Sequence, residues 1–230
     1  MKTSTKIILL FVSLLLAGML TLYITTKYRH RSEPPKVEWK NKILEPFSVV
    51  VAFEKTNCNI SGYDNNVISW IAQKEGSPKM FVRNDTLYVH SSMNFKNGSE
   101  QVIIHCKTLR SIIANKVCKL LLSDINSGPL KVFVNGGNVT IDNSNFNSEK
   151  PYDRTIDLTV EAENLAYVYL SNVKVGKWII SLNKAKIIAN EGVQSQDMKL
   201  VLKDRSYAEF KTGPKNITLD RDSTSKVVIN

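Results

Sequence analysis

Two pairs of acidic residues have a spacing that suits carbohydrate cleavage. Glu161 and Glu163 are two positions apart, as are Asp220 and Asp222. Side chains two apart on a β-strand point to the same face, so each pair would present two carboxyl groups on one surface. Paired acids in a groove serve glycoside hydrolysis, and carboxylates also hold calcium. These four residues are the candidate catalytic residues of an alternative in which the chain is a polysaccharide lyase or hydrolase.

The acidic residues two positions apart also have a purely structural explanation, because a β-strand places every second side chain in solvent. The sequence contains no nucleophile elbow, no glycine-rich phosphate loop and no His-Glu zinc helix motif. Tyr167, Tyr169 and Tyr207 are the main aromatic residues at outward positions, and they give slight support for a carbohydrate-stacking platform. We therefore favour a non-catalytic protein, with no catalytic residue and no cofactor.

The histidines and cysteines lack the spacing of a metal site. A zinc site needs three or four convergent ligands, whereas the neighbours His105 and Cys106 would point to opposite faces of a strand. We therefore predict no metal. Three cysteines allow at most one disulfide, and buried thiols in apolar strands are the favoured alternative. The residues concerned are His30, His90, His105, Cys58, Cys106 and Cys118.

The basic charge gathers at the N-terminus. The formal net charge is +10, and residues 1–31 hold five basic residues and no acidic one. The rest of the chain has 26 basic and 21 acidic residues, without a dense Lys or Arg run. A nucleic-acid-binding surface normally clusters its cations, so nucleic acid is not a predicted partner. A hydrophobic fraction of 43% predicts a folded domain with a sizeable core.

Residues 7–26 form an uncharged apolar run that predicts a membrane segment. Twenty helical residues at about 1.5 Å each match a bilayer core of about 30 Å. A cleaved signal peptide usually has a shorter apolar stretch and a small-residue cleavage site. The only small pair, Ala17-Gly18, lies inside the run, and the first cysteine is Cys58, too distant to carry a lipid. We predict a signal anchor over residues 1–26, with a cleaved signal as the alternative.

The next segment, residues 27–46, is polar and contains three prolines. Such a composition suits a semi-extended juxtamembrane linker, followed by a folded domain over residues 47–230. Basic residues flank both sides of the apolar run, so charge does not decide its orientation. We place the C-terminal domain outside the cytoplasm because a short N-terminus before a large β domain is typical of an exported protein.

From residue 47 onward, short apolar runs of period two alternate with Gly, Asn, Asp or Ser, which is typical of β-strands and turns. From about residue 109 these runs become regular, with two strands in each unit joined by a polar corner such as 135–138. The positions that lead successive units are 130, 156, 178, 198 and 217, which are spaced 26, 22, 20 and 19 apart.

A repeat of about 20 residues that cannot bury its own apolar face predicts a solenoid, in which stacked units share one core. Antiparallel β-sandwiches also have short strands at a spacing of about 8–12 residues, and they remain the alternative. The constant two-strand content of the units and the recurrence of asparagine near the corners favour the solenoid. The corner asparagines are Asn126, Asn145, Asn164, Asn172, Asn183 and Asn190.

Four segments, together with the later two-strand units, carry a family resemblance. They read FSVVV at 47–51, NDTLYV at 84–89, VIIHC at 102–106 and LRSIIA at 109–114. The chain resembles the auto-transporter adhesin head GIN domain family of Bacteroides-like cell envelopes. The resemblance covers about residues 47–230 and implies a right-handed parallel β-helix. The family has no established catalytic residues, so the resemblance assigns none here.

Together these features predict a membrane-anchored, adhesin-like binding module of the cell envelope. The apolar segment 7–26 would hold it in the inner membrane, and the β domain would present a long polar face to a glycan or an envelope protein. If the signal is cleaved, the domain is instead periplasmic or secreted. The ligand itself does not follow from the sequence.

Overall fold

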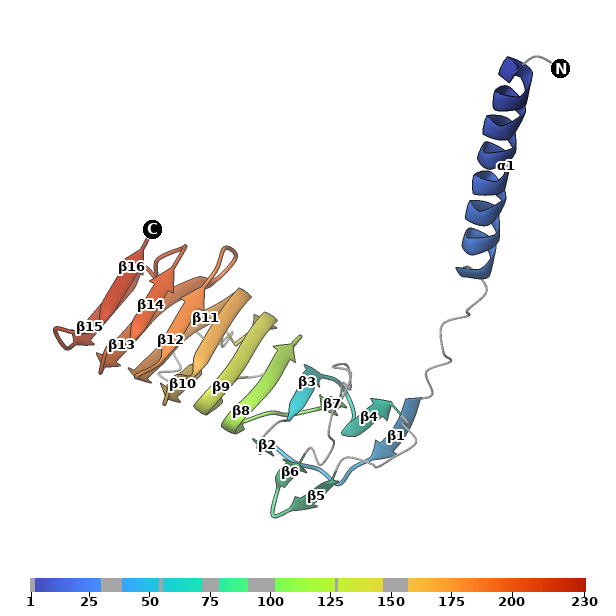
Figure 1. Cartoon of the computed structure of the whole chain (residues 1–230). Coiled ribbons are helices and arrows are strands. Elements are labelled where there is room, and N and C mark those ends of the chain that lie inside the picture. Colours follow the sequence, from blue (N-terminus) through green and yellow to red (C-terminus); the bar gives the residue numbers. More distant parts are fainter. Residues whose placement is uncertain are drawn as a thin grey trace. The chain divides into compact units, whose positions relative to one another are not determined.

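The structure of the protein is a computed structural model, which describes residues 3–29, 39–53, 56–71, 79–90, 102–126, 128–146 and 157–230. It divides into two compact units, Met1–Glu38 and Trp39–Asn230 (Figure 1). His30 and Ile156, which the sequence analysis singled out, lie outside the described residues, and so does the side chain of Cys118.

The N-terminal unit contains one helix, α1 (Thr3–Arg29). Its described side chains are exposed and mostly apolar, a pattern that suits a lipid environment. Residues Leu10–Lys27 are long and apolar enough to cross a membrane, and a signal sequence near an N-terminus has the same properties. The predicted N-terminal apolar helix is therefore confirmed.

The second unit is built from β-strands, which pair into one mixed sheet that does not close on itself. The strands of its described residues are β1 (Trp39–Ile43), β2 (Val49–Ala52), β3 (Asn57–Gly62), β4 (Val67–Ile71), β5 (Lys79–Arg83), β6 (Thr86–His90), β7 (Val102–Cys106), β8 (Ser111–Ser123), β9 (Leu130–Asn145), β10 (Leu158–Glu163), β11 (Tyr167–Asn183), β12 (Lys186–Ala189), β13 (Gln194–Lys203), β14 (Tyr207–Phe210), β15 (Asn216–Arg221) and β16 (Lys226–Ile229). The all-β prediction is confirmed.

From β8 to β16, strands pair in parallel with strands one repeat away, in two series (Figure 1). We call the series through β10, the C-terminal half of β11, β13 and β15 the first face. The second face runs through the N-terminal half of β11, β12, β14 and β16. The positions that align along the first face are Leu130, Leu158, Trp178, Met198 and Ile217.

The repeat length predicted from the sequence is therefore close to the observed one. Leu158, rather than position 156, aligns with Leu130, and the aligned positions along the first face are offset by 28, 20, 20 and 19. Inward side chains alternate with outward ones and form one continuous core. Val160, Ile180 and Leu200 lie in line on three neighbouring strands and are fully buried. Each unit thus covers the apolar side chains of its neighbour.

Several corners between the two faces use backbone of positive φ. Gly136 (φ 64°) turns the predicted 135–138 corner, where a residue without a Cβ avoids strain. Asn164 and Asn172 also have positive φ, as expected for corner asparagines. Leu165 and Arg205 share this conformation, although neither residue type favours it.

The beginning of the stack differs from the regular part. Three pairings there are antiparallel, namely β5 with β6, β4 with β7, and β1 with β4. The strand order is also not that of the chain, because β2 lies between β6 and β8 and pairs in parallel with both. The strand β1 falls within segment 27–46, for which the sequence predicts a linker. Because of the antiparallel pairs the sheet is mixed, which also fits the sandwich alternative.

Candidate functional site

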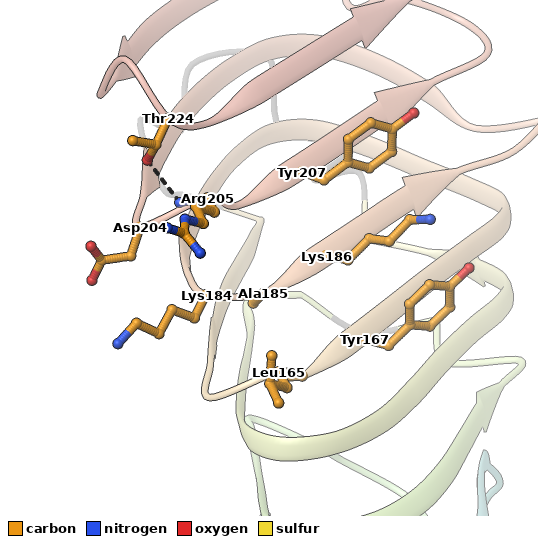
Figure 2. A pocket seen from close by; sticks show the side chains of 10 residues that line it. Leu165, Tyr167, Lys184, Ala185, Lys186, Asp204, Arg205, Tyr207 and Thr224 are labelled. Atoms are coloured by element: carbon orange, nitrogen blue, oxygen red, sulfur yellow. Dashed lines mark hydrogen bonds between the residues drawn. The ribbon is translucent and has the colours of Figure 1, made fainter.

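A cleft of about 790 Å³ lies on the surface of the second face, where it meets the preceding corners (Figure 2). One wall is the row Tyr167, Lys186 and Tyr207, at the first positions of β11, β12 and β14. The floor contains the small side chains Ala166 and Ala185, which leave room between the walls. The other wall is made by corner residues, namely Leu165, Lys184, Asp204, Arg205 and Thr224.

The tyrosine wall results from strand register. Tyr167 pairs with Lys186, and Lys186 pairs with Tyr207, so the three side chains stand on successive strands and point outward together (Figure 2). The Lys186 ammonium nitrogen lies 5.7 Å from the Tyr167 ring centroid and 4.9 Å from the Tyr207 centroid. A cation over an aromatic face is attracted to it, so the lysine links the two rings.

Hydrogen bonds fix the neighbouring part of this face. The Tyr207 hydroxyl donates to a Glu209 carboxylate oxygen (2.8 Å), and the Asn190 amide donates to the Tyr169 hydroxyl (2.8 Å). The bond to Glu209 raises the pKa of Tyr207, and burial, with Tyr169 and Glu209 nearby, raises the pKa of Tyr167. Both phenols of the wall are therefore protonated near neutral pH and are hydrogen-bond donors.

The corner wall is strained and exposed. Leu165 has φ 65° and is 86% exposed, so a bulky apolar side chain occupies a conformation that glycine or asparagine would adopt more easily. Such outliers cost about 1–3 kcal/mol and cluster at functional sites. Lys184, Asp204 and Arg205 also have positive φ, so this conformation recurs at the corners of successive repeats.

The three predicted tyrosines lie on the second face, whereas the two predicted acid pairs begin on the first face. Glu161 and Asp220 stand there in the column that runs through Ser181 and Val201. Three strand steps of about 4.8 Å separate these two acids by about 14 Å. The carboxylates of a glycosidase are about 5–9.5 Å apart, so the two pairs would not act on one bond together, and each pair stays a separate candidate. Glu161 and Glu163 remain neighbours on one outward face of β10.

Asp222 stabilises the turn that follows β15. Its carboxylate accepts hydrogen bonds from the backbone amides of Asp204, Thr224 and Ser225 and from the Thr224 hydroxyl. Bonds from Ser225, Asp204 and Thr224 lower its pKa to about 2, well below the ordinary 3.8. The carboxylate is thus ionised and its acceptor sites are occupied by donors of the corner.

This low pKa predicts a pH dependence of stability. Since the pKa is depressed in the folded state, the stabilisation is complete above about pH 3.8 and is lost as pH falls through about 2. Asp222→Asn should therefore be less stable than wild type at neutral pH, and this difference should shrink between pH 3.8 and 2. Urea unfolding across this range measures it. A difference that stays constant with pH would contradict the role of the carboxylate.

The described histidines and cysteines form no metal site. No group of three or more His, Cys, Asp or Glu residues lies together among the described residues. The His105 Nδ1 atom is 2.8 Å from the Ser61 hydroxyl, and its ring lies against Tyr63. Cys58 and Cys106 are buried, and burial raises the pKa of the Cys106 thiol to about 11, so this thiol is protonated and unreactive.

A second aromatic group, which sequence reasoning missed, lies on β5, β6 and the residue after β2. The Phe53 and His90 rings stack with centroids 4.0 Å apart, and the Phe81 and Tyr88 rings stack at 4.9 Å. Phe81 is 51% exposed. Tyr88 and His90 alternate with aliphatic residues in 86–90 and so indicate a strand with one aromatic face. The pairing of β5 with β6, which places Phe81 opposite Tyr88, cannot be predicted from the residue spacing.

Comparison with known proteins tests the fold. No protein-family description matches the chain, and no curated protein does, so the GIN domain resemblance is not confirmed. A solved structure from Bacteroides fragilis, named a "putative adhesin", is similar with a TM-score of 0.55 at 11% identity, over 86% of this chain and 98% of that one. This similarity concerns the fold alone.

Two further solved structures are similar at lower scores. One, named a "putative adhesin" from Parabacteroides merdae, has a TM-score of 0.42 at 10% identity, over 85% of this chain and 97% of that one. The other, named a "putative lipid binding protein" from Parabacteroides distasonis, has a TM-score of 0.41 at 8% identity, with the same coverage of the two chains.

Proposed function

We propose that the chain is a non-catalytic, adhesin-like binding module of the cell envelope, and that the tyrosine wall is its binding surface. The observation that carries this proposal is the row Tyr167, Lys186 and Tyr207, held in parallel register on one outward face. Flat aromatic faces stack on sugar rings, and the neighbouring Asn190 and Glu209 supply polar groups for hydroxyls. A glycan is therefore the expected ligand.

We propose further that the parallel stack winds as a right-handed β-helix and that the chain belongs to the GIN domain family. From Leu158 onward the offsets between aligned positions along the first face are 20, 20 and 19, which supports the helix because stacked repeats of one length are typical of solenoids. In this proposal α1 anchors the chain in the inner membrane, and residues 47–230 lie outside the cytoplasm. A cleaved signal would leave the same domain periplasmic or secreted.

The double variant Tyr167→Ala/Tyr207→Ala should lose glycan binding. Loss of central aromatic contacts typically costs about 2 kcal/mol or more, so the affinity should fall more than tenfold. The experiment is a glycan-array screen of wild-type protein and variant, followed by calorimetry on each ligand found and by analysis of the products.

Tyr63→Ala is the matched control, because Tyr63 is 61% exposed and belongs to a different part of the fold. It should leave the affinity unchanged. An equal loss with both variants would contradict the proposed surface. Release of shortened glycans would contradict a non-catalytic function and would direct attention to Glu161 and Glu163, which share one face of β10.

A further inference from the structure

We propose that the cleft beside the tyrosine wall binds an acidic glycan, one that carries carboxylate, sulfate or phosphate groups, with its chain running along the stack. This inference rests on the proposed glycan-binding function and names its ligand class. It is drawn from the charge of the cleft, the position of Lys186 and the periodicity of the wall.

The charges that line the cleft favour an anion. Lys184, Lys186 and Arg205 supply three positive charges, and Asp204 supplies one negative charge, so the lining has a net charge of +2. In Figure 2 the side chains of Asp204 and Lys184 both point away from the tyrosine row. Lys186 on one wall and Arg205 on the other remain as cations, so an anionic group in the cleft would be attracted from both walls.

Lys186 is placed to select that anion. Its ammonium group lies between the rings of Tyr167 and Tyr207, within 5.7 Å of both centroids. An ammonium held beside two aromatic rings is less free than one on an open surface, so less side-chain entropy is lost when it pairs with a ligand. The protonated Tyr167 phenol adds a hydrogen-bond donor next to it. A sugar ring against a tyrosine would thus bring its acidic substituent to Lys186.

The wall has a period that suits a polymer. Tyr167, Lys186, Tyr207 and Lys226 follow one another on four neighbouring strands, so aromatic and cationic side chains alternate. Strand neighbours are about 4.8 Å apart, so like groups recur about every 10 Å along the stack. An extended chain of acidic sugars laid along this row would meet a ring and a cation in turn, and affinity should increase with chain length.

The test uses the full chain in lipid nanodiscs. The probes are a short oligogalacturonide, its methyl ester, a sulfated oligosaccharide and inorganic phosphate. The acidic oligosaccharides should bind at least tenfold more tightly than the ester, because hydrogen bonds to charged groups contribute about 1.5–3 kcal/mol. Binding should weaken as the salt concentration increases.

The Lys186→Gln variant should remove the preference for the acidic oligosaccharide over its ester, whereas Lys199→Gln should keep it, since Lys199 is an exposed lysine of β13, on the first face.

The outcomes separate this inference from the proposed function. If acid and ester bind equally and Lys186→Gln changes nothing, the acidic ligand class is wrong, although glycan binding stands. If no oligosaccharide binds, both proposals fail. If inorganic phosphate binds as tightly as the oligosaccharides, the cleft is an anion site and the glycan assignment is overturned. The relative affinities of the carboxylated and sulfated probes identify which acidic group is preferred.

Discussion

Replacement of Ile180 by aspartate is expected to prevent residues 39–230 from folding. Ile180 is fully buried in β11, in line with Val160 and Leu200 on the neighbouring strands. Loss of the apolar side chain alone costs about 2–5 kcal/mol. An unpaired carboxylate in the same place adds several kcal/mol more. The sum is comparable to the whole stability of an ordinary domain, which is about 5–15 kcal/mol.

The matched control is Lys199→Asp, which places the same carboxylate on the neighbouring strand β13 at an exposed position. Its free energy of unfolding should lie within about 0.5 kcal/mol of the wild-type value, as it does for most surface substitutions. Circular dichroism and limited proteolysis distinguish the two variants. A folded Ile180→Asp protein with wild-type resistance to protease would contradict the inward and outward alternation on which the core is built.

Gly62→Ala is expected to destabilise the fold through a clash with the backbone of a neighbouring corner. A Cβ atom at position 62 would lie 2.4 Å from the backbone carbonyl oxygen of Asp124, a distance that requires the backbone to move. Gly62 ends β3, and Asp124 lies at the corner just after β8 with φ 56°, so neither segment yields easily. Overpacking of this kind costs about 3 kcal/mol.

Gly213→Ala is the control for this prediction. Its added Cβ would lie 2.9 Å from the Cγ2 methyl group of Ile229, whose side chain is 45% exposed and can shift toward solvent. Its free energy of unfolding should stay within about 1 kcal/mol of wild type. Urea denaturation of both variants gives the comparison, and equal stabilities for the two would show that β3 and the β8 corner do not approach as closely as described.

The regular half of the fold could be predicted because its information is local. Leu130, Trp178 and Met198 lead successive units in the sequence and align across neighbouring strands. A period of two determines which side chains are buried, and the longer repeat determines which strands are neighbours. The first half could not be predicted in this way. Nothing in the spacing shows that β2 lies between β6 and β8, because that order depends on distant pairings.

The candidate site was only partly visible in the sequence. Alternation identified Tyr167 and Tyr207 as outward residues, but their grouping around Lys186 depends on the register of three strands. The corner wall gave no signal, since a leucine such as Leu165 is not expected at a strained, exposed turn. The structural role of Asp222 also gave no signal. Its spacing from Asp220 predicts two acids on one face, but it does not show that the Asp222 carboxylate accepts hydrogen bonds from the corner backbone.

The place of β2 also determines how the domain responds to mechanical load. A pull applied at Trp39 first meets β1, which among the described strands is an edge strand that pairs with β4, and its hydrogen bonds can break one after another. The load then reaches β2, which is bonded along both edges to β6 and β8, so two ladders must break together. In the proposed adhesin-like function, a chain held by its N-terminus would thus have a compliant first strand and a stiff second one, and it would lengthen slightly under tension before the tyrosine wall is disturbed.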